Sequence, residues 1–228
     1  MRHFPWMVTL LLATAACEDI SSTDLLTGGI NAHIVGTARG TGQTEVVAVL
    51  KAGGGLSNTF VDLEGDDELS VTAGDQSATL VKRSLGVLHD YAATVDFDSP
   101  DETFAVAFDR LVDEGAPNST FVLPDPFTLG AVADAMDPTT TLEVSWSPAE
   151  DGEIEVTIDG SCILTYTQDE GNDTGSASIL GSNVETIEDE AGVSCPIEIT
   201  VRRTLGGQLD PAFKEGGLVQ GRQERTTT

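Results

Sequence analysis

Apolar and polar residues alternate along most of this chain, in short runs separated by Gly, Asp, Asn and Pro. In one such run Leu142, Val144 and Trp146 share one parity, and Glu143 and Ser145 share the other. Successive side chains of a β-strand point to opposite faces of its sheet, so a period of two indicates strands with one buried face. The alternation therefore predicts an all-β protein.

The predicted strands are short and follow one another from residue 30 onward. They lie at 44–51, 59–63, 69–73, 77–81, 91–97, 104–108, 120–123, 142–146, 154–164 and 195–201. Only two segments, 84–89 and 131–136, have a composition that fits a helical turn.

A change of composition divides the chain near its middle. Pro117, Pro124 and Pro126 flank one short predicted strand, and the alternation becomes cleaner downstream. We place a boundary at Pro124, which gives a first domain over 30–124 and a second over 125–228. Each is long enough for six or seven short strands, so two antiparallel β-sandwiches in tandem are predicted. A single larger sandwich with a long insertion is the alternative.

The first residues have the composition of an export signal. Arg2 and His3 form a basic start, and residues 4–13 are apolar except for Pro5 and Thr9. This run is too short to span a bilayer permanently, but it suits the apolar region of a signal peptide. Residues 1–16 are therefore predicted to be a cleaved signal.

The end of that signal resembles the lipobox of bacterial lipoproteins, because Ala15 and Ala16 directly precede Cys17. The resemblance implies a thioether-linked lipid on Cys17, a membrane partner through that lipid, and a place in the bacterial cell envelope. We expect the outer membrane, on its periplasmic or surface face. Thr14 stands where the family usually has Leu, and ordinary signal-peptidase cleavage near Ala15 or Ala16 is the alternative.

Residues 17–29 are predicted to be a lipidated tether. As a flexible coil, such a segment would hold the first domain about 20 Å from its anchor.

The three cysteines divide into a pair and a remainder. Cys162 and Cys195 both fall on the core-facing parity of predicted strands, which is what a buried bridge requires, and Cys17 is left for the lipid. In an oxidising compartment a Cys162–Cys195 disulfide is expected, and it would enclose 169–190 as an excursion outside the sandwich. Two buried free thiols are the alternative.

The chain is strongly acidic, with 11 Lys and Arg against 38 Asp and Glu and a formal charge of −27. Such a charge repels nucleic acid, so we expect no nucleic-acid partner, and it favours basic partners or divalent cations. Five of the basic residues nevertheless lie among the last 27 positions: Arg202, Arg203, Lys214, Arg222 and Arg225. They are expected to pair across strands with acids such as Glu198 and Glu224, or to form a basic face for an anionic ligand or for the acidic first domain.

Acidic turns supply the only candidate metal ligands. Calcium takes six to eight oxygen ligands, and strand-end carboxylates can provide them. The candidates are Asp96, Asp98, Asp101, Asp169 and Asp173. None fits the twelve-residue EF-hand loop, so solvated acidic turns are the alternative, and no other cofactor is expected.

Catalytic residues are not apparent. After the signal the chain has only two histidines, His33 and His89, and no G-x-S-x-G elbow. Both histidines are expected to be partly exposed structural residues. With so many acids, a carboxylate pair for polysaccharide hydrolysis stays possible.

Trp146 resembles the core tryptophan of immunoglobulin- and fibronectin-like sandwiches, because it lies on the core parity of its strand. Together with the lipobox, this makes the chain similar to bacterial surface lipoproteins built from such sandwiches. The resemblance implies a non-enzymatic binding or structural module whose partner is an envelope protein, a polysaccharide or a cation. A carboxylate-dependent hydrolase of envelope or extracellular polysaccharide is the alternative.

Overall fold

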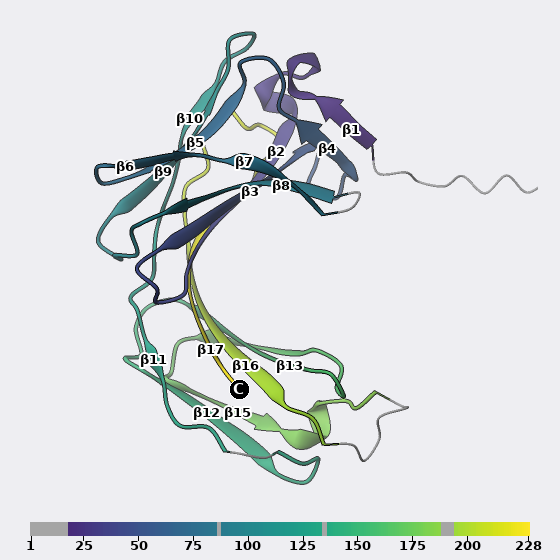
Figure 1. Ribbon diagram of the computed structural model, residues 1–228, viewed down its shortest axis with the longest axis vertical. Coiled ribbons are helices and arrows are strands. Elements are labelled where there is room, and N and C mark those ends of the chain that lie inside the picture. The colour runs from purple at the N-terminus through teal and green to yellow at the C-terminus, as the bar shows by residue number, and fades with distance from the viewer. Residues whose placement is uncertain (1–17, 86–87, 134–135, 188–193) are drawn as a thin grey trace, which may run out of the picture.

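The structure is a computed structural model that describes residues 18–85, 88–133, 136–187 and 194–228 (Figure 1). Within these residues it is all-β, which confirms the predicted fold class. The strands are β1 (Glu18–Ser21), β2 (Ile30–Ala38), β3 (Thr44–Ala52), β4 (Thr59–Asp62), β5 (Glu68–Ala73), β6 (Gln76–Thr79), β7 (Val81–Leu85), β8 (Leu88–Val95), β9 (Thr103–Asp109), β10 (Ala116–Val122), β11 (Thr128–Leu129), β12 (Thr141–Ser147), β13 (Glu153–Gly160), β14 (Tyr166–Asn172), β15 (Ser176–Leu180), β16 (Ile197–Gly206) and β17 (Gly217–Thr227). Three short 3-10 turns accompany them: η1 (Ser22–Asp24), η2 (Thr27–Gly29) and η3 (Gly181–Asn183).

One ten-stranded sheet runs through the whole molecule. Its main order is β1-β4-β3-β2-β17-β16-β13-β14, with β8 also paired to β3 and β7 paired to β8. A four-stranded sheet, β10-β9-β5-β6, and a three-stranded sheet, β11-β12-β15, lie against it (Figure 1).

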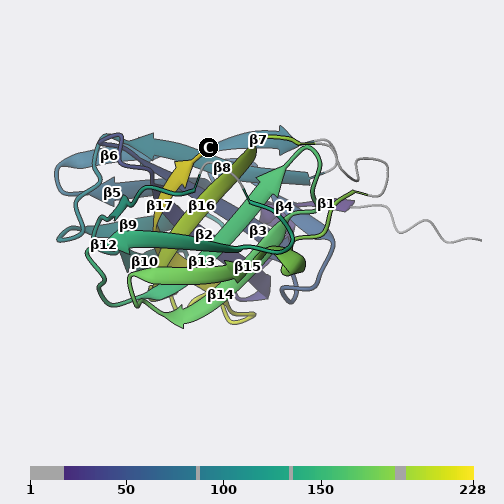
Figure 2. The same cartoon turned by 90° about the horizontal axis from the view of Figure 1, so that it is seen from below.

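The two smaller sheets enclose two separate cores. Phe104, Phe108 and Phe121 belong to the first core, which the four-stranded sheet covers. Val144 and Trp146 belong to the second, which the three-stranded sheet covers. Figure 2, seen from below, shows β12 and β15 in front of β13, β16 and β17. We call the part around the first core lobe 1 and the part around the second core lobe 2.

Both cores lie on the same face of the ten-stranded sheet. Ile34 of β2 is opposite Val219 of β17, and both are buried in the first core. On the same face two strands further on, Val201 of β16 is opposite Val156 of β13, and both are buried in the second core. Among the described residues, no strand covers the other face of this sheet in either lobe.

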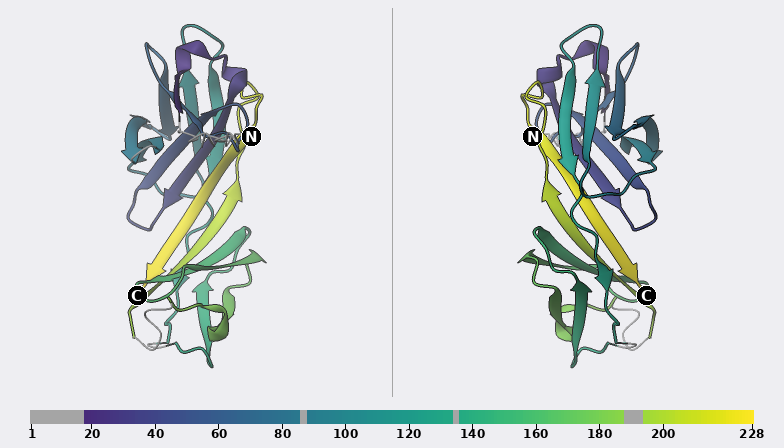
Figure 3. Two further views of the ribbon diagram at one scale, coloured as in Figure 1. Left: turned by 90° about the vertical axis from the view of Figure 1, so that its right-hand side faces the viewer. Right: turned by 90° about the vertical axis from the view of Figure 1, so that its left-hand side faces the viewer.

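β17 joins the lobes, because it pairs in parallel with β2 and antiparallel with β16. Figure 3 shows β17, in yellow, running from lobe 1 to lobe 2. The cores separate between Leu123 and Phe127, next to the predicted boundary at Pro124. However, Phe213 and Val219 pack in the first core, so the segment assigned to the second domain also completes the first.

The tether predicted for 17–29 is wrong for residues 18–29. They begin with β1, which pairs in parallel with β4, and they bury Ser22 and Thr27 completely. The sequence did not indicate this ordered structure, because hydrogen bonds of polar side chains hold the segment and it has no apolar stripe. Cys17 and the predicted signal lie outside the described residues.

Three further predictions need correction. Of residues 84–89, expected to form a helical turn, 84–85 end β7 and 88–89 begin β8, and Ser84 lies opposite His89. The described part of 131–136 contains no helix. The strand expected over 154–164 ends at Gly160.

The predicted disulfide is present, with 6.0 Å between the Cα atoms of Cys162 and Cys195. Gly160 of β13 is opposite Ile197 of β16, so the same register places Cys162 opposite Cys195 just beyond the ladder. The enclosed segment is not an excursion, because β14 pairs with β13, and Ala177 and Ile179 of β15 are buried in the second core.

Candidate functional site

The candidate site is the uncovered face of the ten-stranded sheet, which we call the inner face. The molecule is bent like a letter C, and this face lines the inside of the bend (Figure 1). Strand registers place Val35 of β2, Val47 of β3 and Gln220 of β17 on it, among other residues of both lobes. Because regular strands hold these side chains, their spacing is fixed by the sheet.

Seven charged side chains form a continuous chain of ion pairs across the inner face. In order they are Asp90, Arg83, Glu45, Arg39, Glu224, Arg202 and Glu155. Acidic and basic members alternate throughout, and the chain passes from β8 in lobe 1 to β13 in lobe 2. Exposed ion pairs contribute little stability individually, about 0–1 kcal/mol each. Their main effect here is to fix alternating charges on a shared surface.

The lobe 1 half of this chain centres on Glu45. Arg83 donates to Glu45 at 2.7 Å and to both oxygens of Asp90, at 2.8 and 3.0 Å. Arg39 reaches the other oxygen of Glu45 at 3.1 Å. Hydrogen bonds from Arg83, opposed by burial and assisted by Arg39, hold the pKa of Glu45 below its usual value. Glu45 is therefore a fixed negative charge at neutral pH.

The lobe 2 half centres on Glu224. Arg39 donates to one oxygen of Glu224 at 3.1 Å, and Arg202 donates to the other from Nε and Nη2 at 3.2 and 3.1 Å. Arg202 also pairs with Glu155. The predicted cross-strand pairing of Arg202 with Glu224 is thus present.

A small polar hollow of about 140 Å³ lies beside this half. Glu153, Thr204 and Arg222 occupy one cross-strand row, and Glu155 and Arg202 occupy the next. The short side chain of Thr204 between two long neighbours leaves the space open. Asp169 and Gln220 complete the charged and polar lining.

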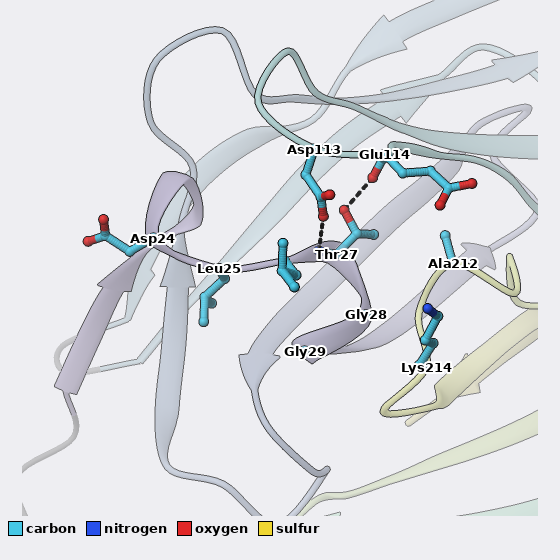
Figure 4. A pocket seen from close by; sticks show the side chains of 10 residues that line it. Asp24, Leu25, Thr27, Gly28, Gly29, Asp113, Glu114, Ala212 and Lys214 are labelled. Atoms are coloured by element: carbon cyan, nitrogen blue, oxygen red, sulfur yellow. Dashed lines mark hydrogen bonds between the residues drawn. The ribbon is translucent and has the colours of Figure 1, made fainter.

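A second, larger hollow of about 500 Å³ lies at the far end of lobe 1 (Figure 4). The backbone N–H of Thr27 donates to Asp113 at 2.6 Å, and the Thr27 hydroxyl donates to the carbonyl of Glu114. The hydrogen bond from the Thr27 N–H is the main cause of the lowered pKa of Asp113. Leu25, Leu26 and Ala212 supply apolar lining. These contacts fasten the N-terminal segment to the lobe.

The predicted calcium ligands do not converge. Asp96 accepts a hydrogen bond from Gln43 at 2.7 Å and Asp98 from the N–H of Gly42 at 3.0 Å, both in lobe 1. Asp101 is exposed on the nearby loop. Within the described ranges, no three His, Cys, Asp or Glu side chains are grouped to hold a metal ion.

The other two predicted ligands lie in lobe 2 in different surroundings. Asp169 is on β14 and lines the polar hollow. Asp173 instead accepts hydrogen bonds from the indole of Trp146 at 2.7 Å and from Nε of Arg203 at 2.7 Å. It serves as the counter-ion of a buried arginine.

The histidines have unlike environments. His89 was expected to be partly exposed, but it is buried between Phe60 and Tyr91, and its Nε2 lies 3.0 Å from the Val61 carbonyl oxygen. His33 lies on the inner face and is largely exposed. Partial burial of its ring, followed by the charge of Lys51, lowers its pKa. Within the described ranges, neither histidine is hydrogen-bonded to a Ser, Thr or Cys side chain.

The polysaccharide-hydrolase alternative would place an acid pair and aromatic side chains in a cleft. Neither of the two hollows is lined by an aromatic side chain.

Sequence reasoning missed the inner face as a site. The parity of Glu45, Arg202 and Glu155 predicts only that they point away from a core. That they meet depends on the parallel pairing of β2 with β17, which no local pattern indicates.

Comparison with known proteins adds no assignment, because the chain matches no protein-family model and no curated protein. Among the described residues, no helix has the length and apolar character to cross a membrane.

Proposed function

We propose that this protein is a non-enzymatic binding module of the bacterial cell envelope, anchored by a lipid on Cys17, whose inner face contacts the ligand. The observation that carries the proposal is the continuous chain of ion pairs across an uncovered face that both lobes build. Charges fixed on rigid strands give specificity, because their geometry does not have to be ordered when a ligand binds.

The curvature of the molecule supports this use of the face. A partner lying inside the bend contacts lobe 1 and lobe 2 together (Figure 1). An extended polysaccharide or a polypeptide segment fits such a surface better than a small molecule does.

The binding part is tested with printed arrays of polysaccharides and peptides. Arg39→Glu places a third acid between Glu45 and Glu224. We expect this variant to bind the captured ligands at least about tenfold more weakly than the wild type. The matched control is Glu143→Lys on the outer face of lobe 2, where the exposed Glu143 accepts only a hydrogen bond from Ser178. Equal losses in both variants, or no captured ligand, would contradict the proposal.

The anchoring part is supported by the Ala15-Ala16-Cys17 sequence and by the pairing of the other two cysteines. Because β1 already begins at Glu18, a lipid on Cys17 would hold the edge of lobe 1 directly against the bilayer.

Replacing Cys17 by Ser tests this anchor in a bacterial host. We expect the wild type in the membrane fraction, with a mass that includes the lipid, and the variant in the soluble fraction. A mature wild-type N-terminus at residue 16 or 17 without lipid would establish ordinary signal-peptidase cleavage instead.

A further inference from the structure

The polar hollow of the inner face contains an arginine that lacks a counter-ion in the described structure. Arg202 contacts two carboxylates, but no carboxylate of the described residues lies within 4.0 Å of the Arg222 nitrogens. Arg222 donates from Nη2 to Gln220 at 2.8 Å, and its buried Nε has no hydrogen-bond partner among the described residues.

This arrangement is energetically unfavourable for the guanidinium. Burial, followed by repulsion from Arg202, lowers the pKa of Arg222, but a guanidinium does not lose its proton in the physiological range. A partly buried positive charge without an ion-pair partner loses part of its hydration, and an incoming anionic oxygen would compensate for that loss. Arginine suits a carboxylate especially well, since its donors match the two oxygens.

The opposite side of the hollow has the opposite charge. Glu153 lies across Thr204 from Arg222, and Asp169 lies across β13 in the neighbouring row. One carboxylate oxygen of Asp169 accepts a hydrogen bond from the N–H of Gly171 at 2.8 Å, and Glu153 is exposed. These acids disfavour a ligand that is only anionic, but they suit a ligand that also carries an ammonium group.

We propose that this hollow binds the zwitterionic group of an α-amino acid, with its carboxylate on Arg222 and its ammonium toward Glu153 and Asp169. The hollow of about 140 Å³ holds a group of this size, since one water occupies about 30 Å³ of liquid. This inference rests on the proposed function and deepens it, because it names one chemical group that the inner face recognises.

Calorimetric titration of the soluble Cys17→Ser protein tests the inference with four probes. L-Alanine carries both charges, propionate only the carboxylate, ethylamine only the ammonium, and sulfate is a dianion. We expect L-alanine to bind at millimolar concentration or below, and each of the other three to bind at least about tenfold more weakly. Absence of L-alanine binding, or propionate or sulfate binding as tight as L-alanine, would overturn the inference.

Variants locate the binding. Arg222→Gln and Glu153→Gln should each weaken the binding of L-alanine by about tenfold, whereas Glu143→Lys, on the outer face of lobe 2, should change it by less than about twofold. Circular dichroism and thermal midpoints establish that the variants fold. If L-alanine fails to bind while array ligands still depend on Arg39, this inference is wrong and the proposed function stands. If L-alanine binds through Arg222 but no array ligand depends on Arg39, the broader proposal is wrong.

Discussion

At the scale of single residues, the least expected feature is the fully buried ion pair of Arg203 and Asp173 in lobe 2. Arg203 also donates to the carbonyl oxygens of Asp125 and Pro148, both at 2.6 Å, and its guanidinium lies 4.8 Å from the centre of the Phe127 ring. One side chain thus holds three separate segments together where the chain enters lobe 2.

Arg203→Met should therefore destabilise the protein strongly. The change leaves Asp173 buried without its counter-ion and two carbonyl groups without a donor, which costs about 3–5 kcal/mol of unfolding free energy. Urea denaturation measures this loss. Arg39→Gln, which removes two ion pairs of an arginine that is 51% exposed, should cost less, about 1 kcal/mol or below. Similar values for both variants would contradict a structural role for Arg203.

The same pair predicts how stability depends on pH. Burial raises the pKa of Asp173, but hydrogen bonds from Trp146, Gly175, Glu150 and Arg203 outweigh burial and lower it on balance. A carboxyl whose pKa is lower in the folded state stabilises the protein above its unfolded pKa of about 3.9, and this contribution is lost as the pH falls.

Asp173→Asn should accordingly reduce the acid sensitivity of folding. Denaturation midpoints of the wild type should fall below about pH 4, and those of the variant should fall less steeply over the same range, although they start lower at pH 7. Identical slopes for the two proteins below pH 4 would show that Asp173 does not titrate on unfolding.

Single residues were also the hardest to assign from the sequence. Asp173 was a candidate calcium ligand because it follows a run of acids, and the parity of Arg203 gives it a core-facing position without naming a partner. Thirty residues separate the two, and only the folded chain brings them together. Local patterns report which face a residue occupies, not which side chain lies opposite.

At the scale of elements, the alternation located most central strands well, because burial of one face decides both the strand and its period. The alternation did not locate strands that lack a buried apolar face. β14, with polar residues at most positions, was predicted to be an acidic loop, and β1 was predicted to be a tether. Edge strands such as these depend on backbone pairing to a neighbour, which leaves no apolar stripe in the sequence.

The pairing of β13 with β16 does carry a sequence signal, because its register leads directly to the disulfide. Replacing both Cys162 and Cys195 by Ser should lower the unfolding free energy by about 3–4 kcal/mol, since the bond closes a loop of about 34 residues. Denaturant titration of the double variant and of the reduced wild type should give the same loss. No loss in either would mean that the bond adds nothing to the β13–β16 ladder.

At the scale of the whole molecule, the ten-stranded sheet makes the two lobes one structure rather than two independent domains in series. β2 has β17 as its neighbour on one side, and the ring of Phe121 lies over both strands. Gly36 and Gly221, opposite each other in β2 and β17, allow this approach, because a Cβ at Gly36 would lie 2.2 Å from that ring.

The chain should therefore not fold when it is cut at the boundary that its composition suggests. A fragment of residues 18–124 contains all of β1 to β10, but it lacks Phe213 and Val219 of the first core and leaves the backbone groups of β2 unpaired along the edge that β17 covers. The lost ladder hydrogen bonds and a partly empty core together cost several kcal/mol, which is comparable to the whole stability of a small domain. We expect this fragment to show a poorly dispersed NMR spectrum and no cooperative urea transition, whereas residues 18–228 should unfold in one transition that is the same by fluorescence and by circular dichroism. A sharp, independent transition of the fragment would mean that lobe 1 is a domain in its own right, and that β17 only rests against it.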